Sequence, residues 1–433
     1  MPSAPLLERL GLRSRELRAW ALYDWANSVF MTTVLQVFPI YFRTVAAGEL
    51  APSLASERFA IATSLSIGVA GLASPLLGAL ADIAARKKAF LAGFAFLGAA
   101  ATGAMFLVER GDWLLGAVLF GLGNIGAVAS IVFYNALLPH IARPEEVDRV
   151  SSAGFALGYI SGGLVLALNL LFIQRPELFG LANREAGFRL SFLCAAAWWA
   201  VFTLPVLRRV PEPVIRALPG EDPAAGSLPR ALARVRKTLA TARQHPDAAL
   251  LLLAFLIYND GINTIIRMAT IYGSEIGIPA ASLILAVLMV QFLGVPFAFL
   301  FGQLAGRIGA KRSIVLALGV YVGISLLGWR MANARDFFAL AFLVGTVMGG
   351  AQALTRSLFA SMLPKSKSAE LFGFYGVFDK FGGVIGAALF ALTLRLTGSS
   401  RPAILAIAAS FVIGILILSR VDVERGRRMA AEG

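Results

Sequence analysis

Residues 20–30 read WALYDWANSVF, and the apolar run continues through residues 31–42, MTTVLQVFPIYF. Asp24 and Asn27 interrupt a stretch that is otherwise long enough to cross a bilayer, which takes about 20 residues. An ionised side chain at the centre of such a helix costs about 3 kcal/mol, so it tends to face a cavity or a partner. The stretch therefore predicts a membrane-spanning helix whose polar side chains have a function.

The composition of the whole chain is that of a membrane protein. Of its 433 residues, 58% are hydrophobic and 15% are charged, with a mean hydropathy of +0.76, whereas soluble domains carry about 25% charged residues. The single cysteine, Cys194, excludes a disulfide framework. His140 and His245 stand apart from other metal-binding side chains, so we expect no metal and no cofactor.

Hydropathy and charge breaks divide the chain into twelve predicted transmembrane helices. Their limits are 19–43, 58–81, 88–108, 112–139, 152–174, 188–207, 247–272, 280–304, 312–331, 336–363, 371–395 and 402–419. The predicted fold class is an all-α polytopic membrane protein. We expect an N-terminal segment 1–18, a six-helix bundle 19–207, a central loop 208–246, a second six-helix bundle 247–419 and a tail 420–433. Within the central loop, residues 228–244 predict an amphipathic surface helix.

The distribution of Lys and Arg predicts the orientation. With the N-terminus placed inside, 26 of the 39 basic residues fall in inside segments and 10 in outside segments. Because basic loops are retained in the cytoplasm, both termini are expected there. The same distribution accounts for the net charge of +14 through an anionic membrane surface rather than nucleic acid.

The two halves of the sequence repeat one another. YDWANS from Tyr23 matches YNDGINT from Tyr258, and GALADIAARKK from Gly78 matches GQLAGRIGAKR from Gly302. ALLP at 136–139 likewise matches SMLP at 361–364. Three matches in the same order predict a duplicated six-helix unit. In secondary transporters, such repeats place the substrate site at their interface and rock against each other.

The segment GALADIAARKK resembles the loop motif that follows the second helix of the major facilitator superfamily, in which an acid and basic residues latch a gate. Ile83 departs from the usual basic residue, Ala85 from the usual glycine, and Gly306 replaces the acid of the second copy. The resemblance implies a gate latch that is weaker in the second half. Its expected residues are Gly78, Asp82, Arg86, Lys87, Gly302, Arg307, Lys311 and Arg312.

Further stretches are similar to the autophagy-linked vacuole effluxer branch, whose bacterial members form an "unknown major facilitator" group. They are WALYDWANSVF, SPLLGALAD, RVSSAGFALGYISGGL and GGAQALTRSLFASMLP. This resemblance covers most of the chain and implies transport, in the inner or plasma membrane if the protein is bacterial. Fungal members are implicated in the release of amino acids from the vacuole, and the resemblance leaves the bacterial substrate open.

Polar residues within the predicted spans are the candidates for a substrate and proton pathway. Asn263, Thr264 and Arg267 follow Asp260 by three, four and seven residues, which places them on one helix face. The resemblance implies that the first and seventh spans line a central cavity. The candidate set is Asp24, Asn27, Asp260, Asn263, Thr264, Arg267, Gln352, Arg356 and Lys380.

Adjacent residues on a helix point about 100° apart, so Asp379 and Lys380 are not expected to face the same partner. We expect Lys380 to face the cavity and Asp379 to pair with a neighbouring helix, and the reverse stays open. Single amides and tyrosines in membrane bundles more often form interhelical hydrogen bonds than bind ligands. Such weaker candidates are Asn124, Tyr134, Asn135 and Asn169.

Acids and bases within the spans suit a zwitterion such as an amino acid. Arg267, Arg356 or Lys380 would hold a carboxylate, and Asp24 or Asp260 would hold an ammonium group or carry a proton. The sequence has no phosphate-binding loop, so direct ATP drive is not expected. The leading prediction is a monomeric, proton-coupled secondary transporter of small polar solutes, with the lipid bilayer as its partner. Efflux of amphipathic compounds and a non-transporting receptor are the alternatives, and no enzyme is expected.

Overall fold

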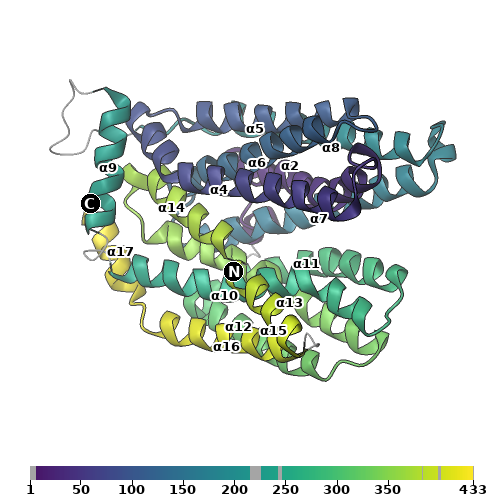
Figure 1. Cartoon of the computed structure of the whole chain (residues 1–433). Coiled ribbons are helices and arrows are strands. Elements are labelled where there is room, and N and C mark those ends of the chain that lie inside the picture. Colours follow the sequence, from purple (N-terminus) through teal and green to yellow (C-terminus); the bar gives the residue numbers. More distant parts are fainter. Residues whose placement is uncertain (1–5, 215–225, 242–245, 383, 398–400, 433) are drawn as a thin grey trace.

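The computed structural model describes residues 6–214, 226–241, 246–382, 384–397 and 401–432. Every regular element in these ranges is a helix, and the long helices form two bundles that lie side by side, purple to blue and green to yellow in Figure 1. The first bundle contains the continuous span Arg15–Ala46, which is α2 (Arg15–Val29), a π-helical turn (Phe30–Val34), α3 (Leu35–Tyr41) and a second π-helical turn (Phe42–Ala46). It continues with α4 (Pro52–Ala84), α5 (Lys87–Ala104), α6 (Trp113–Ile141), α7 (Val147–Gln174) and α8 (Arg184–Arg209).

The second bundle follows the amphipathic helix α9 (Ser227–Thr241). It consists of α10 (Pro246–Glu275), α11 (Ala280–Ile308), α12 (Ala310–Trp329), α13 (Ala334–Ser361), α14 (Ser368–Phe381), α15 (Val384–Thr397) and α16 (Arg401–Ser419). The short helices α1 (Leu6–Arg9) and α17 (Val423–Glu432) lie near the two ends of the chain.

Eleven of the described helices are long and apolar enough to cross a membrane. They correspond to eleven of the twelve predicted spans. The remaining prediction, residues 371–395, falls on α14 and α15, each too short to be counted. The all-helical membrane fold is confirmed, and so is the amphipathic helix in the central loop. The predicted N-terminal segment, central loop and tail each include positions outside the described residues.

Local sequence explains where several helices begin and end. The side chain of Ser14 accepts a hydrogen bond from Leu17 N at the start of α2, and Asn183 and Asn333 cap α8 and α13 in the same way. Helix α4 begins with Pro52 and ends at Ala84, and the next residue, Ala85, has a left-handed φ of 51°. Ala85 occupies the position where the superfamily motif has a glycine, which adopts this conformation without steric cost.

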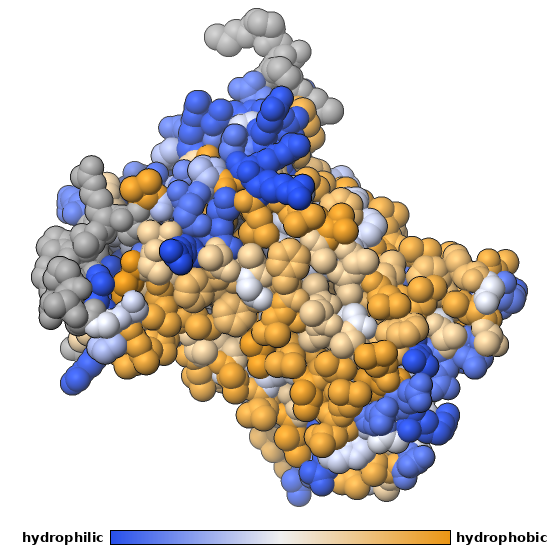
Figure 2. Space-filling view, turned by 90° about the horizontal axis from the view of Figure 1, so that it is seen from above, coloured by the Kyte–Doolittle hydropathy of each residue, from blue (hydrophilic) through white to orange (hydrophobic). Residues whose placement is uncertain are grey.

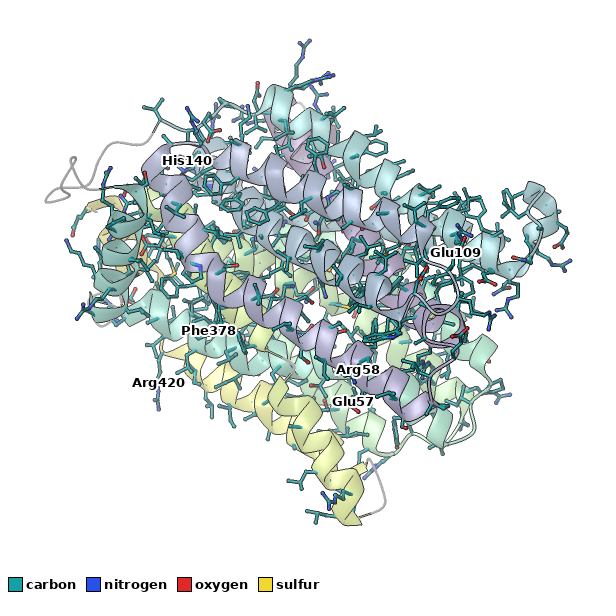
Figure 3. The ribbon with its side chains drawn as sticks, turned by 45° about the horizontal axis from the view of Figure 1, so that its top comes forward. Glu57, Arg58, Glu109, His140, Phe378 and Arg420 are labelled. Atoms are coloured by element: carbon teal, nitrogen blue, oxygen red, sulfur yellow. The ribbon has the colours of Figure 1, made fainter. Side chains whose placement is uncertain are left out.

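The surface matches a membrane environment. Figure 2 shows a broad hydrophobic area between hydrophilic ends. In Figure 3, His140 and Arg420 lie toward one end of the molecule, whereas Glu57, Arg58 and Glu109 lie toward the other. Exposed leucines on the long helices therefore face the lipid rather than water.

Contacts define two ends of the molecule. The termini face is the end that carries the starts of α2, α7, α10 and α14 together with α9 and α17, and the loop face is the opposite end. The bundles contact each other through α4 with α14, α7 with α11 and α13, and α6 with α14. Helix α9 packs against α4 at the termini face (Figure 1).

A candidate substrate cavity between the bundles

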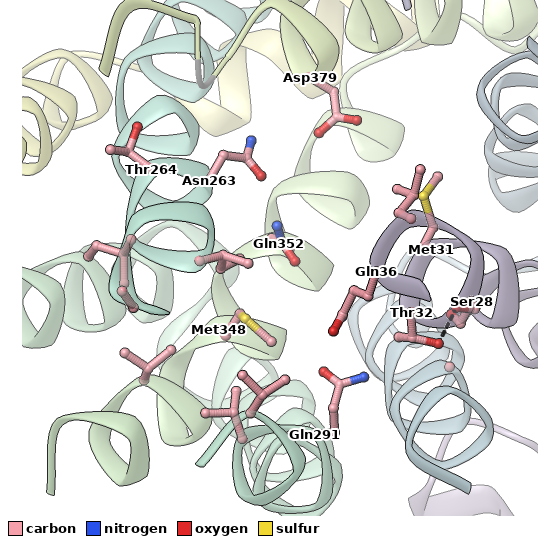
Figure 4. Close-up of a pocket in the computed structure, with 18 of the residues that line it drawn as sticks. Ser28, Met31, Thr32, Gln36, Asn263, Thr264, Gln291, Met348, Gln352 and Asp379 are labelled. Atoms are coloured by element: carbon pink, nitrogen blue, oxygen red, sulfur yellow. Dashed lines mark hydrogen bonds between the residues drawn. The ribbon is translucent and has the colours of Figure 1, made fainter. Parts of the chain in front are cut away.

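A cavity of about 890 Å³ lies between the two bundles. Its walls reach Phe337 near the start of α13 and Met331 in the preceding loop, so the cavity extends to the loop face. Figure 4 shows α2 on one wall and α10 and α13 on the opposite wall. The predicted pathway residues that line it are Asp24, Asn27, Asn263, Thr264, Gln352, Arg356 and Lys380.

Asp24 pairs with Arg356 at the boundary of the bundles. Nη1 of Arg356, on α13, lies 3.0 Å from Oδ2 of Asp24, on α2. The Tyr134 hydroxyl donates to the same oxygen at 2.8 Å. The exposed fraction of the side chain is 3% for Arg356 and 11% for Asp24, so this charge pair is almost fully removed from water.

Arg356 has further partners in the first bundle. Its Nε donates to Ser151 Oγ at 2.8 Å, and Nη2 donates to the Ser151 carbonyl at 2.7 Å. The guanidinium also lies over the rings of Trp20, Tyr134 and Phe155, at 4.9, 5.5 and 4.4 Å from their centroids. Such contacts add cation–π attraction. Arg356 therefore ties the second bundle to α2 and α7 of the first.

A glycine stripe on α7 makes room for these polar residues. A Cβ atom on Gly154 would collide with Asp24 Oδ2, and one on Gly158 would collide with Ser28 Oγ. One on Gly162 would lie 2.7 Å from Cγ2 of Thr32. The stripe and the polar residues share a spacing of four, so α2 and α7 approach closely along one line.

Asp260, the acid of the second bundle that matches Asp24 in the repeat, forms a different kind of contact. Asp260 Oδ1 accepts a hydrogen bond of 3.0 Å from the Gly386 amide on α15, and a Cβ on Gly386 would collide with Thr264. The acid is buried and does not belong to the described cavity lining. Asp260 thus bonds within its own bundle, whereas Asp24 bonds across the boundary. The side chain of Arg267 lies outside the described residues.

Asp379 and Lys380 both line the cavity, which differs from the expectation that only one of them would. Lys380 Nζ lies 2.8 Å from Asp379 Oδ2. The long lysine side chain bends back across the angle between the two positions, so adjacent residues can pair. Asp379 also accepts a hydrogen bond from Asn259 Nδ2 on α10 at 3.2 Å, as expected for a tie to a neighbouring helix.

The first copy of the loop motif closes the termini face. The Asp82 carboxylate at the end of α4 accepts hydrogen bonds from the amides of Ala369 and Glu370 at the start of α14, at 3.3 and 2.9 Å. Lys87 Nζ lies 2.6 Å from Asp82, and both side chains are fully buried. A carboxylate is favourable at a helix N-terminus. A Cβ on Gly78 would collide with the Ala369 carbonyl, so this glycine permits the close contact.

The remaining motif residues have other surroundings. Arg86, Arg307 and Arg312 are exposed. Lys311 Nζ donates to the carbonyls of Ser419 and Val421 at 2.7 Å, so it caps the end of α16 within the second bundle. Gly302 packs against α7, since a Cβ there would lie 2.8 Å from Ser152. The second copy therefore keeps the close helix approach without the acid that joins the bundles.

Comparison with known proteins identifies the family. Residues 53–431 match the family model "Vacuole effluxer Atg22 like". The chain belongs to this family.

Its relatives and structural neighbours include transporters of the major facilitator superfamily. The chain is 34% identical to YxiO of Bacillus subtilis, described as an uncharacterized MFS-type transporter, over 95% of this chain and 96% of the relative. It is 24% identical to autophagy-related protein 22-1 of Penicillium rubens, covering 96% and 91% of the two chains. The proton:xylose symporter XylE has the same fold, with a TM-score of 0.69, 14% identity and 96% coverage of both chains. FucP in its outward conformation aligns with a TM-score of 0.67 and 13% identity over 95% of this chain and 99% of FucP.

The Atg22-like chain is therefore a major facilitator transporter, as the sequence motifs indicated, and not an enzyme. Several residues that line the cavity were not among the predicted pathway residues. Gln36 and Gln291 line the cavity but were not candidates, although each is a lone amide in an apolar run. Ser151 gave no signal, because serine is common in membrane helices and its partner Arg356 is 205 residues away.

Proposed function

We propose that this Atg22-like protein is a secondary active transporter that moves a small zwitterionic solute, such as an amino acid, by alternating access. One observation carries the proposal: a cavity between the bundles contains two acid–base pairs and reaches the loop face while the termini face is held closed. In such transporters the site lies at the interface of the repeats, and rocking exposes it to each side in turn. We further propose that the termini face is cytoplasmic, as the basic residues indicate, so that the described state faces outward.

The two acid–base pairs have different roles in this proposal. Asp379 and Lys380 lie on the cavity wall with exposed side-chain fractions of 26% and 22%, so a solute can reach them. They would bind the ammonium and carboxylate groups of a zwitterion. Arg356 is 3% exposed and occupied by Asp24 and Ser151. We assign the Asp24–Arg356 pair to the coupling of proton binding with opening of the termini face.

A flux measurement in proteoliposomes tests this function. Purified protein is reconstituted and uptake of a labelled amino-acid mixture is measured with and without an imposed pH gradient. We expect uptake driven by the gradient, loss of proton drive in Asp24→Asn, and weaker uptake in Lys380→Met. Gradient-driven uptake that survives Asp24→Asn would refute the coupling assignment.

Efflux of amphipathic compounds is the second candidate, and the character of the cavity wall favours it. Met31, Met268 and Met348 line the cavity beside Phe155 and Tyr159. Flexible thioethers and aromatic rings accept apolar ligands of varied shape. Protection of cells against lipophilic cations, abolished by Arg356→Met, would support this candidate over amino-acid transport.

A further inference from the structure

Of the seven described carboxamide residues that line the cavity, four come from α3, α10, α11 and α13, and so from both bundles. Gln36 belongs to α3, Asn263 to α10, Gln291 to α11 and Gln352 to α13, and we call them the carboxamide quartet. Figure 4 shows Gln36 and Gln291 directed toward each other from opposite walls, with Gln352 and Asn263 on the side of the second bundle. Within the described part of the chain, the side-chain amides of the quartet form no hydrogen bond with another protein group. Their donors and acceptors are available to a solute.

The charged groups of the same cavity are already paired. Asp24 is bound to Arg356 and Asp379 to Lys380. A carboxamide offers two N–H donors and a carbonyl acceptor, so the quartet supplies both kinds of partner without net charge. A solute group that donates and accepts at once, such as a hydroxyl or another carboxamide, is its chemical complement.

We propose that the carboxamide quartet binds the side chain of the substrate and selects for a neutral polar one. This inference rests on the proposed function, because it takes Asp379 and Lys380 as the binding site of the zwitterionic head. The substrate class is then an amino acid with a carboxamide or hydroxyl side chain, of which glutamine, asparagine and serine are examples.

The quartet would select a neutral polar side chain because apolar and charged side chains would leave polar groups without partners. An apolar side chain would displace water from the quartet and leave its amides unpaired, and sites built on hydrogen bonds reject such analogues strongly. A charged side chain would find Asp379 and Lys380 occupied by the zwitterionic head and Asp24 and Arg356 paired with each other, so its lost hydration would not be replaced. Gln36 comes from the first bundle and the other three from the second, so a solute that bridges them also joins the two bundles.

Exchange in proteoliposomes tests the inference with single substitutions. Vesicles loaded with unlabelled glutamine, serine, leucine, glutamate, lysine or the polyol xylitol are assayed for uptake of the same labelled compound. Wild-type protein is expected to exchange glutamine and serine at least about tenfold faster than leucine, glutamate or lysine. Gln291→Met and Gln352→Met keep the side-chain length and remove the hydrogen bonds, so each should reduce glutamine exchange about tenfold and narrow the gap to leucine.

A matched control is available on the same helix. Gln303 lies on α11 but does not line the cavity, so Gln303→Met should leave the order of solutes unchanged. Thermal unfolding of each purified variant verifies that the protein is folded.

The outcomes separate this inference from the proposed function. Equal exchange of glutamine and leucine by wild-type protein, or an unchanged ratio of glutamine to leucine exchange in Gln291→Met and Gln352→Met, overturns the inference and leaves amino-acid transport standing. Exchange of xylitol but of no amino acid refutes the proposed function. If that xylitol exchange is lost in Gln291→Met and Gln352→Met, the quartet would still be supported as a binding site for neutral polar groups. Xylitol carries only hydroxyl groups, so its exchange would have depended on the hydrogen bonds of the quartet.

Discussion

Replacing Asp24 by Asn is expected to open the termini face. The substitution keeps the shape of the side chain and an acceptor for Tyr134 but removes the charge that faces Arg356. Because these side chains are 11% and 3% exposed, water screens the pair little. Leaving one partner of a buried pair uncompensated costs about 3 kcal/mol. Opening hydrates Arg356, so this cost falls on the closed state and raises the ratio of open to closed molecules about a hundredfold.

Distances between spin labels report this equilibrium. Arg86 and Arg312 are exposed and follow α4 and α11, one in each bundle. Both are changed to Cys in a Cys194→Ala background, labelled, and studied by double electron–electron resonance. We expect a longer-distance population in Asp24→Asn. Asp260→Asn serves as the matched control, because the equivalent acid bonds to Gly386 within one bundle.

The double variant Asp24→Asn with Arg356→Met removes both charges and should return the labels toward the wild-type distances, apart from the loss of the hydrogen bonds to Ser151. A distance distribution in Asp24→Asn that is identical to the wild type would refute the reasoning. The reasoning would also be refuted if the open population of the double variant exceeded the combined increase seen in the two single variants, because the pair would then not stabilise the closed state.

Three other perturbations have defined outcomes. Gly78→Val forces α4 away from the start of α14, since even a Cβ collides there, so the same labels should separate. Asp82→Asn leaves Lys87 buried without its counter-charge and should lower the free energy of unfolding by about 3 kcal/mol, measured by denaturation in detergent. Burial acts to raise the pKa of Glu146, but hydrogen bonds and the charge of Arg13 outweigh it, so the pKa lies below its usual value. Stability from this pair is therefore present above about pH 4.3 and is lost as the pH falls through the folded-state pKa. Arg13→Gln should remove this pH dependence.

Each of these predictions has a control. Gly93→Val adds a side chain on α5 where nothing lies within 4 Å, and it should leave the label distances unchanged. Disruption of the exposed pair Arg175–Glu177 should alter neither the unfolding free energy nor its pH dependence. Unaltered label distances in Gly78→Val, unaltered stability in Asp82→Asn, or acid sensitivity retained in Arg13→Gln would contradict the respective prediction.

The sequence by itself determined the membrane class, the long helices and the repeat. Hydropathy is a local property, and the thickness of the bilayer sets the length of an apolar run, so spans can be read without knowing what they contact. The match between Asp24 and Asp260 also required only a comparison along the chain. Helical spacing likewise placed Asn263 and Thr264 on one face, and both line the cavity in the structure.

The tertiary structure alone decided which polar groups meet. Asp24 and Arg356 are 332 residues apart and join only because α2 and α13 approach at the boundary of the bundles. The repeated acid Asp260 has the same local sequence pattern, yet it bonds to α15. Lys87 rather than Arg86 pairs with Asp82, because the turn at the end of α4 buries one basic side chain and exposes the other. Which polar side chains pair in a helical membrane protein depends on how its helices cross. That geometry leaves no signal in the sequence around each residue.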